Sequence, residues 1–368
     1  MPLRIALVYE LRSAYKAIGY TDADCLRLCV GRAADRIASS LRQHGHHVLL
    51  IPDLRSFVRW LASDGEHQDI VFNITEGLHG MAREAQVPAL LEAYQIPFTF
   101  SDAATMALCL DKARTKMILE HYGVPTAPFA VIHSHQGKSM LSSERDLLEG
   151  SHHERTLDYP LFVKPLAEGS SSGITGMNKV HNASELRDVI AKIYASAPTS
   201  QDILVEKFLS GREFTIAVMG TGERSWVLGA DEFVWRDDQH VAKVDGMTGD
   251  MDVLMPFMTR NCKVDVALGD KQRVEQVAAN ESQPAVQRAC EVGLEAWRVL
   301  GCRDCGRVDV RLDGNDAYVL EINPLAGLHP ETSELPMIAQ HKGVAYEDLM
   351  EMIVHSAMER YTPVRLSN

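Results

Sequence analysis

The sequence has little of what a membrane-spanning or nucleic-acid-binding protein requires. It contains no run of about 18 apolar residues, so no membrane-spanning helix is expected. Basic residues are in deficit, because 37 Lys and Arg stand against 50 Asp and Glu, and the net charge is −13. Nucleic-acid backbones are bound by basic surface, so we expect neither a nucleic-acid nor a membrane partner. The first ten residues hold too short an apolar run for a signal peptide and favour a strand.

Cysteine is too sparsely paired for a zinc site. The chain has seven cysteines in 368 residues, and only Cys302 and Cys305 form a C-x-x-C pair. A typical zinc ligand set needs a second pair, and none accompanies this one. Four others lie in apolar helical patterns and are predicted to be small core residues: Cys25, Cys29, Cys109 and Cys290. Reduced thiols suit the cytoplasm, which is the expected compartment.

The first hundred residues alternate strand and helix patterns. Strands are predicted over residues 3–9, 47–51, 69–73 and 96–100. Helices are predicted between them: one capped by Asp22 or Asp24 and ended by Gly45, one over 54–61, and one over 85–94. Such alternation is typical of a parallel sheet with helices on both faces. Ligands of such sheets lie beyond the carboxyl ends of the strands, which draws attention to Glu10 and to the loop 75–80.

After residue 100 the alternation is less strict, and strands dominate from residue 212. Predicted helices begin at Ser101-Asp102 and cover 113–122, 185–194 with Ser184 as cap, 284–300 and 344–361. Predicted strands cover 129–132, 161–165, 203–208, 213–219 and 225–233. We expect a surface excursion over 133–158, with a short helix near 142–148, and a mobile loop over 235–252. No internal repeat is present, and the fold class is a mixture of α/β and α+β structure.

The stretch 306–327, GRVDVRLDGNDAYVLEINPLAG, carries polar residues at unusual places. It predicts two strands joined by a tight Asp-Gly turn. Side chains two apart point to the same face of a strand. Arg307 and Asp309 therefore share one face of the first strand, and Glu321 and Asn323 share one face of the second.

The acids of this hairpin predict a metal site. Glu321 stands in an apolar run, and a buried acid is costly unless a cation or hydrogen bonds meet it. Two carboxylates about 4 Å apart repel by about 1 to 4 kcal/mol, depending on how dry the site is. A hard cation with oxygen ligands is the simplest relief, and Asp, Glu and Asn suit Mg²⁺. The predicted ligands are Asp309, Glu321 and Asn323.

Two further stretches have features of a nucleotide site. In FVKPLAEGSSSG, Lys164 precedes a Ser/Gly loop whose N–H groups could approach a polyphosphate, although the Walker order is missing and a plain hairpin turn is the alternative. In VEKFLSGREF, Glu206 and Glu213 flank a strand end that could hold adenine and ribose. The alternative is that they are ordinary acids at a strand end.

Together these motifs carry a family resemblance. LDKARTK, YPLFVKPLAEGSSSG, VEKFLSGREFTIAV, GRVDV and VLEINPLAGL, in this order and spacing, resemble the ATP-grasp superfamily and within it the D-alanine–D-alanine ligase family. The segment VFNITEG…VPALLEAYQIPFTFS is similar to the first domain of that family, and the resemblance covers about residues 65–345. It implies three domains: a parallel-sheet N-terminal domain over 1–110, a small central subdomain over 111–206, and a C-terminal catalytic domain over 207–368.

The resemblance also implies roles for residues at matching positions. ATP would lie between the central and C-terminal domains, with its phosphates held by Lys112 and Lys164. The loop closing over the phosphates would contribute Glu168, Gly169, Ser171 and Ser172, and Ser170 among the catalytic residues. The adenosine would be bound by Glu206, Lys207, Phe208, Leu209 and Glu213. Mg²⁺, or Mn²⁺ in its place, would be held by Asp309, Glu321 and Asn323.

The implied reaction joins a carboxylate to an amine through an acyl phosphate, in an ADP-forming ligase. Catalysis would be largely positioning and electrostatics. Arg307 and the Gly327 N–H would stabilise the oxyanion, and Lys243 on the 235–252 lid would reach the γ-phosphate. The substrates would be small amino acids or amines, bound by Glu10, Glu76, His79 and Ser333. A homodimer is the assembly usual in this family.

Three departures from the family pattern concern the substrates. The family's Gly-Gly-x-Ser-x-Glu turn is replaced by residues 9–13, where Glu10 either takes the acid's role or is a plain strand-end acid. The tyrosine usual after the lid lysine is Val244, and either His79-Gly80 or Glu76-Gly77 occupies the place of the His-Gly pair. These changes favour other substrates, in specialised metabolism. The alternatives are a housekeeping D-alanine–D-alanine ligase of cell-wall synthesis and a degenerate ATP-binding module without chemistry.

Overall fold

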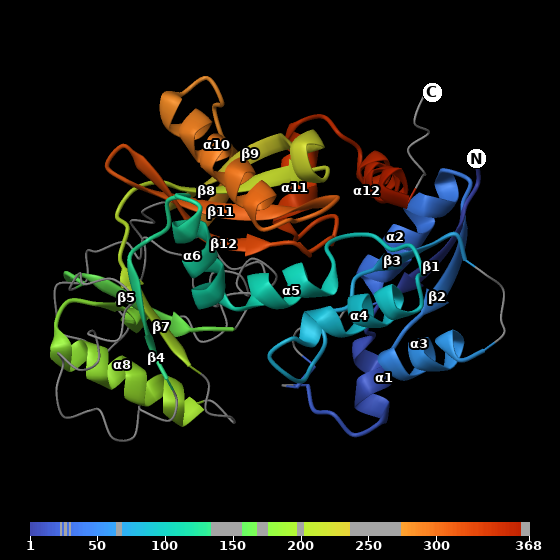
Figure 1. Cartoon of the computed structure of the whole chain (residues 1–368), viewed down its shortest axis with the longest axis horizontal. Coiled ribbons are helices and arrows are strands. Elements are labelled where there is room, and N and C mark those ends of the chain that lie inside the picture. The colour runs from blue at the N-terminus through green and yellow to red at the C-terminus, as the bar shows by residue number, and fades with distance from the viewer. Residues whose placement is uncertain are drawn as a thin grey trace, which may run out of the picture.

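The structure is a computed structural model of the 368-residue chain and contains three β-sheets with helices packed on them (Figure 1). It describes residues 1–22, 24–25, 28, 31–63, 68–133, 157–167, 176–196, 202–235 and 274–361. The short helix predicted near 142–148 and nearly all of the loop predicted over 235–252 lie outside these residues. Among the described helices, none combines the length and the apolar character needed to cross a bilayer.

The N-terminal sheet is parallel, as the alternating pattern predicts. Its order is β2-β1-β3, with β1 Arg4–Val8, β2 His47–Ile51 and β3 Ile70–Asn73. The helices are α1 Arg12–Ala17, α2 Arg32–Gln43, α3 Leu54–Leu61 and α4 Gln86–Ala93, the last preceded by a 3₁₀ turn, Arg83–Ala85. Successive residues of β1 face opposite sides, so Leu7 packs in the cluster that includes α2 while Val8 packs in the one that includes α3 and α4.

Two predictions for this region are wrong. Residues 96–100 do not form a fourth strand, because only Phe98 bridges to Val71, and Pro97 has no N–H to donate to the ladder. Neither aspartate caps α2: the side chain of Asp24 accepts hydrogen bonds from Thr21, and that of Asp22 pairs with Lys16. The helix begins only at Arg32, after Gly31 at φ +63°, and α1 was not predicted.

The central sheet is antiparallel, with the order β4-β7-β5-β6. Its strands are β4 Phe129–Ile132, β5 Leu161–Pro165, β6 Lys179–Val180 and β7 Ile203–Lys207. Helix α8, Ala183–Ser196, packs Leu186, Val189 and Ile190 against the sheet. Asn182 rather than Ser184 accepts the capping hydrogen bond from the Glu185 N–H, while Glu185 bonds back to the His181 N–H, so the predicted cap is wrong by two residues.

Two helices connect the N-terminal and central sheets. They are α5 Ala103–Leu110 and α6 Lys112–His121. Asp102 and Asp111 cap them by accepting hydrogen bonds from the N–H groups of Thr105 and Arg114. The capping at Asp111 places Lys112 in the first turn of α6.

The C-terminal sheet is antiparallel, with the order β10-β9-β8-β11-β12. Its strands are β8 Glu213–Met219, β9 Trp226–Trp235, β10 Val274–Ala278, β11 Cys305–Asp313 and β12 Asp316–Asn323. Its helices are α10 Pro284–Val299, α11 Glu334–His341 and α12 Tyr346–Tyr361. Ile216 of β8 packs toward α10 and Ala217 toward α11. Strand β10 and helix α11 were not predicted, and the two turn residues of the hairpin are Gly314 and Asn315.

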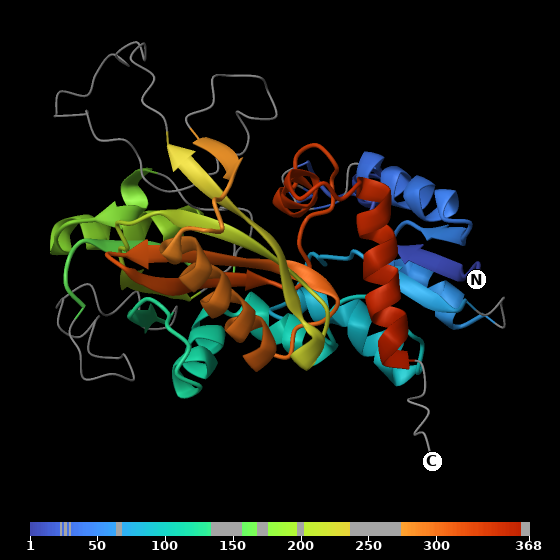
Figure 2. The ribbon, with the colours of Figure 1, turned by 90° about the horizontal axis from the view of Figure 1, so that it is seen from above.

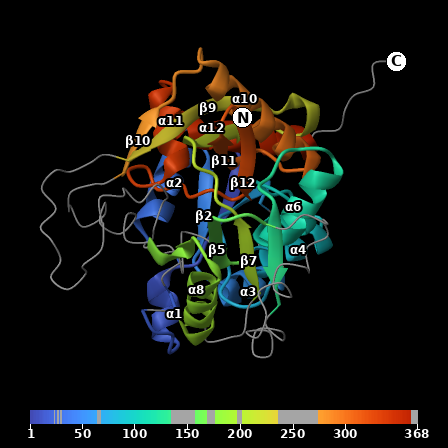
Figure 3. The ribbon, with the colours of Figure 1, turned by 90° about the vertical axis from the view of Figure 1, so that its left-hand side faces the viewer.

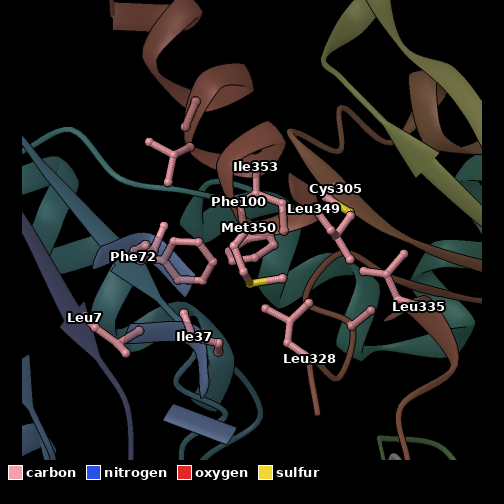
Figure 4. Close-up of a cluster of buried hydrophobic side chains, with 14 of the residues drawn as sticks. Leu7, Ile37, Phe72, Phe100, Cys305, Leu328, Leu335, Leu349, Met350 and Ile353 are labelled. Carbon is pink, nitrogen blue, oxygen red and sulfur yellow. The ribbon is translucent and has the colours of Figure 1, made fainter. Parts of the chain in front are cut away.

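A single large apolar cluster joins the N-terminal sheet to the C-terminal elements (Figure 4). Leu7, Ile37 and Phe72 lie on one side, and Leu335 and Leu349 on the other. The last helix, α12, runs beside α2 and next to the C-terminal sheet, as Figure 2 shows. The two units therefore share a core rather than meeting through a polar linker.

The central sheet lies beneath the β11–β12 hairpin in two perpendicular views (Figures 1 and 3). The Thr126 hydroxyl donates to the Val319 carbonyl over 2.9 Å, and Lys207 Nζ lies 2.6 Å from Asp313 Oδ2. These contacts place the polar face of the hairpin near the two strands that carry Lys164 and Glu206.

Buried thiols bear out part of the cysteine prediction. Cys25 and Cys109 are buried, Cys290 is partly buried, and Cys29 lies outside the described residues. Cys302 and Cys305 are buried and free. Burial raises the pKa of Cys302, which makes its thiol a poor nucleophile and a poor metal ligand.

Candidate active site

The β11–β12 register brings the predicted hairpin residues together. Asp309 stands opposite Glu321, and Arg307 stands opposite Asn323. Opposed side chains on one face of an antiparallel pair are close neighbours. The register slips just after Asp309, where Leu320 is the extra residue, so the polar pairs stay on one face while the apolar residues beyond them stay in the core.

Arg307 is more heavily paired than the sequence suggested. Its Nε and Nη2 donate to Asp309 Oδ1 and Oδ2 over 2.9 and 3.0 Å, and its Nη1 donates to Glu334 Oε2 over 2.7 Å. Burial alone would lower the pKa of Arg307, but the Asp309 and Glu334 carboxylates raise it, so the guanidinium stays charged. The remaining N–H groups are the ones that could reach an oxyanion. Glu334, the first residue of α11, was not predicted.

The donor set fits a magnesium ion. Asn323 Nδ2 is placed 3.4 Å from Asp309 Oδ2 and from Glu321 Oε1, and rotating the amide would put its oxygen beside the two carboxylates. Burial raises the pKa of Asp309, with Glu321 adding to the rise although Arg307 opposes it, which is the electrostatic situation that a cation relieves. Among the described residues no group of three or more His, Cys, Asp or Glu could hold a metal, so the set is two carboxylates and one amide. Mg²⁺ commonly binds through few protein ligands together with substrate phosphates.

Three lysines lie close to acids of this region. Lys112 Nζ lies 3.4 Å from Glu321 Oε2, which joins the first turn of α6 to the hairpin. Lys164 Nζ lies 2.5 Å from Glu206 Oε1, and Lys116 Nζ lies 3.0 Å from Glu206 Oε2. The structure thus brings the two predicted phosphate lysines to acids of the same region. Lys116 was missed, although it is the second lysine of LDKARTK, one helical turn after Lys112.

Glu206 is a buried counter-ion of two lysines. Burial alone would raise the pKa of Glu206, but Lys116 and Lys164 lower it, so the carboxylate stays ionised. Both of its oxygens are engaged by lysines, which differs from the direct adenine contact expected from the resemblance. Its backbone, at the end of β7, remains beside Lys207 and the buried Phe208 and Leu209.

Glu213, the expected ribose ligand, is likewise paired. Its Oε2 accepts a hydrogen bond from Arg311 Nη1 over 2.7 Å. The Arg311 guanidinium lies 5.1 Å from the ring centroid of Phe208, which brings the two ends of the predicted adenosine segment together. Burial raises the pKa of Glu213 although Arg311 opposes the rise.

Among the predicted substrate residues of the N-terminal region, Glu10 and Glu76 are joined by a hydrogen bond, and His79 lies near them through the Tyr15–Tyr20 ring contact. Glu10 is buried, and its Oε2 accepts from the N–H groups of Glu76 over 3.1 Å and Gly77 over 2.6 Å. Its Oε1 accepts from the Tyr15 hydroxyl over 2.7 Å. His79 Nε2 lies 3.0 Å from the Tyr20 hydroxyl, so residues of α1 and of the loop after it, which were not predicted, complete this region.

Gly327 and Ser333, for which the resemblance implies an oxyanion role and a substrate role, are neighbours. A Cβ atom at Gly327 would lie 2.7 Å from Ser333 Oγ, so a larger residue would collide with it. Ser333 Oγ accepts from the His329 N–H over 3.0 Å. In the described part of the chain the Gly327 N–H has no acceptor, which leaves it able to donate to a ligand.

Several predicted residues lie outside the described residues: Lys243, Glu168, Gly169, Ser170, Ser171 and Ser172. A residue that the sequence did not single out stands next to that loop. Arg83 is buried and donates from Nη1 to the Ala167 carbonyl over 3.2 Å, which ties the N-terminal loop to the end of β5. Gly77, at φ +66°, passes so close to Arg83 that a Cβ would lie 2.5 Å from the Arg83 carbonyl oxygen.

Comparisons with known proteins agree with this geometry. The family described as "D-ala D-ala ligase C-terminus" matches residues 118–355. The D-alanine–D-alanine ligase of Rhodospirillum rubrum is 28% identical over 341 residues, covering 92% of this chain and 95% of that protein. That of Desulforudis audaxviator is 30% identical over 330 residues, covering 89% of this chain and 94% of that protein.

Solved structures show the same fold. The D-alanine–D-alanine ligase from Bacillus anthracis superposes with a TM-score of 0.69 at 18% identity, covering 97% of this chain and 98% of that one. The same protein complexed with ATP gives a TM-score of 0.67. This chain belongs to the D-alanine–D-alanine ligase family of the ATP-grasp superfamily and is an ATP-dependent, ADP-forming carbon–nitrogen ligase.

Proposed function

We propose that the protein joins the carboxylate of an amino acid to an amine through an acyl phosphate, with D-alanine in both roles as the first candidate. The observation that carries the reaction type is the opposed pair Asp309 and Glu321 with Lys112 beside Glu321. An acidic pair next to a lysine suits a polyphosphate and its counter-cation. The names of the relatives support D-alanine as the substrate.

In the first step a substrate carboxylate oxygen bonds to the γ-phosphorus of ATP, the bond from that phosphorus to the bridging oxygen breaks, and ADP leaves. Lys112 and Lys164 are positioned to neutralise phosphate charge. Asp309, Glu321 and Asn323 would hold Mg²⁺, which when bound supplies positive charge to the phosphates. The phosphate chain would then lie beside Lys112, Lys164 and the acid pair.

In the second step the amine nitrogen bonds to the acyl carbon, phosphate leaves with the carbon–oxygen electron pair, and the amine proton goes to solvent. The oxyanion that develops needs nearby donors, for which we propose the Arg307 guanidinium and the Gly327 N–H. We propose that Ser333, which is next to Gly327, meets the second substrate. The assignments of Ser170 to catalysis and of Lys243 to the γ-phosphate remain predictions.

A second candidate is the same reaction with other substrates, in specialised metabolism. The specific observation is the setting of Glu10, whose carboxylate already accepts three hydrogen bonds from Tyr15, Glu76 and Gly77. A carboxylate has about four acceptor positions, so one remains for a substrate ammonium group. Tyr15 belongs to helix α1, which stands where the family has a glycine-rich turn.

D-alanine as sole amino acid tests the two candidates. With ATP and Mg²⁺, the first candidate requires ADP, phosphate and a dipeptide in equal amounts, measured by coupled assay and mass spectrometry. Release of ADP only when other amino acids or amines are supplied would support the second candidate and exclude the first. If ATP binds but no member of a broad panel stimulates ADP release, both are wrong.

The division into domains over 1–110, 111–206 and 207–368 remains a proposal. Its support is that each span contains one of the three sheets, apart from Lys207, the last residue of β7. We also propose a cytoplasmic location, supported by the free thiols among the described residues.

A further inference from the structure

A pocket of about 300 Å³ lies at the carboxyl edge of the parallel sheet. Its lining includes Glu10, Asp53 and Leu78, which follow the ends of β1, β2 and β3. This is the edge at which sheets of this kind bind their ligands. Helix α1 and its C-cap residue form a further wall through Ala14, Tyr15 and Ile18.

The two acids that line the pocket are held by the protein itself. Glu10 accepts hydrogen bonds from Tyr15, Glu76 and Gly77. Asp53 caps α3, where Oδ1 accepts from the Ser56 N–H over 2.8 Å and Oδ2 from the Ser56 hydroxyl over 2.6 Å. Neutral donors therefore hold both carboxylates in place, and each carboxylate keeps its charge.

The cationic groups of the pocket are Arg55 and Arg59. They are four residues apart on α3, so they project from the same face of that helix. Neither forms an ion pair or a side-chain hydrogen bond with another residue in the described part of the chain. Guanidinium groups recognise carboxylates and phosphates through paired N–H donors, so this side of the pocket suits an anion.

A series of contacts links the pocket to the segment that follows Lys164. Its Glu10 holds the Glu76-Gly77 backbone, and Gly77 packs on Arg83. Arg83 in turn donates to the Ala167 carbonyl, three residues after Lys164. Glu10 is thereby linked, through Gly77 and Arg83, to the segment that follows Lys164.

We propose that this pocket is the side-chain subsite of the first substrate and that it selects an amino acid with a second anionic group. Glu10 takes the ammonium group, while Arg55 and Arg59 take a side-chain carboxylate or phosphate. D-alanine fits the same position but leaves the pocket unfilled. This inference rests on the ligase function proposed above and adds the class of substrate.

The test compares anionic with neutral first substrates. ATP, Mg²⁺ and D-alanine as the amine are supplied with D- or L-glutamate, O-phosphoserine or glutamine, and the products are resolved by mass. We expect kcat/KM for an anionic member to exceed that for glutamine of the same hand by about tenfold or more. The order of glutamate and O-phosphoserine distinguishes a carboxylate from a phosphate ligand.

The decisive variant is Arg55→Gln/Arg59→Gln. It should raise KM for the anionic substrate by about tenfold and leave the glutamine value unchanged, because only the distal charge is lost. The matched control is Arg32→Gln/Arg36→Gln, also four residues apart and exposed, on α2 outside the pocket. The control removes the same charge from the molecule and should keep the preference.

Equal kcat/KM for anionic and neutral substrates would overturn the subsite, as would a preference that survives in the Arg55→Gln/Arg59→Gln variant. Dipeptide formation from D-alanine with no anionic preference would leave the proposed function standing without the subsite. If no substrate is turned over, calorimetric titration with glutamate and O-phosphoserine decides. Binding that the double variant loses supports the subsite even though the ligase proposal fails, and absence of binding to the unaltered protein overturns it.

Discussion

Glu321 has three kinds of neighbour: it faces Asp309, its carboxylate lies near Lys112, and it stands among apolar residues of its strand. The substitution Glu321→Gln removes a proposed metal ligand but also removes repulsion between two facing carboxylates. We expect turnover to fall by about 10²-fold or more, while the thermal midpoint stays the same or rises. Steady-state ADP release and a thermal melt measure the two effects.

Asp316→Asn is the matched control for this prediction. Asp316 is exposed at the turn end of the same hairpin, so the change removes one charge without touching the acid pair. It should leave both activity and melting unaltered. Glu321→Gln with full turnover would remove Glu321 from the metal site, and a large drop in its melting temperature would assign it a structural role instead.

At the level of single residues, the sequence predicts what depends on local periodicity. The shared faces of Arg307 with Asp309 and of Glu321 with Asn323 follow from the two-residue repeat of a strand. The pairing of Arg307 with Glu334 does not, because it depends on where α11 packs. The same holds for Lys116 and Glu206, which are 90 residues apart in sequence and meet only when α6 packs beside β7.

At the level of elements, Glu206 joins α6, β5 and β7 through Lys116 and Lys164. Glu206→Gln leaves two buried ammonium groups without their counter-ion, so we expect the free energy of unfolding at pH 7 to fall by about 3–5 kcal/mol. Urea denaturation measures this loss. Asp188→Asn, an exposed acid on α8, is the control and should change it little.

The ionisation of Glu206 also predicts how the stability of the protein depends on pH. The pKa of Glu206 is lowered in the folded state, so its charge contributes full stability above the unfolded value of about 4.3. That contribution is lost as the pH falls below this value and through the folded pKa. The stability difference between the unaltered protein and Glu206→Gln should therefore shrink between pH 5 and pH 3. A constant difference across that range would show that Glu206 is not ionised in the fold.

Elements with a strong local pattern could be predicted, and those fixed by distant contacts could not. Strand β8 was predicted at its observed bounds because its apolar run ends at a glycine turn. Helix α1 is only six residues long and buries a single side chain, Tyr15, so it has almost no apolar periodicity to detect. Residues 96–100 have strand composition, but Pro97 limits their pairing to one bridge.

For the whole molecule, Asp304 holds three distant parts of the chain together. Its carboxylate accepts from the Phe100 N–H, from Ser356 and from Arg360 Nε, over 2.7, 3.1 and 3.0 Å. Asp304→Ala leaves the Arg360 guanidinium without its acid, and we expect a loss of about 3–5 kcal/mol in the free energy of unfolding. Urea denaturation, followed with one probe in the N-terminal sheet and one in the C-terminal sheet, measures this loss.

Asp304→Asn removes the charge of this side chain but keeps its size, so it distinguishes the two contributions to stability. Asp304 has φ +64°, a conformation that asparagine tolerates better than alanine. The asparagine variant should lose less stability than the alanine variant, because it keeps acceptors for some of the donors. Glu359→Ala, which removes an exposed ion pair with Arg224, is the control and should cost less than about 1 kcal/mol. If all three variants lose the same small amount of free energy of unfolding, Asp304 does not hold the three parts of the chain together.

Ligand binding should couple the central sheet to the C-terminal sheet, because Lys164 lies on one and the acid pair on the other. ATP with Mg²⁺ at about 100 times its dissociation constant should stabilise the fold by about 2.7 kcal/mol. A large excess of EDTA should remove most of that gain if the phosphates bind through the metal. In Glu321→Gln the gain from ATP should become nearly independent of Mg²⁺, since one of the two proposed carboxylate ligands is gone. Differential scanning fluorimetry with and without EDTA checks this, and an Mg²⁺-dependent gain that persists in the variant would place the metal away from the hairpin.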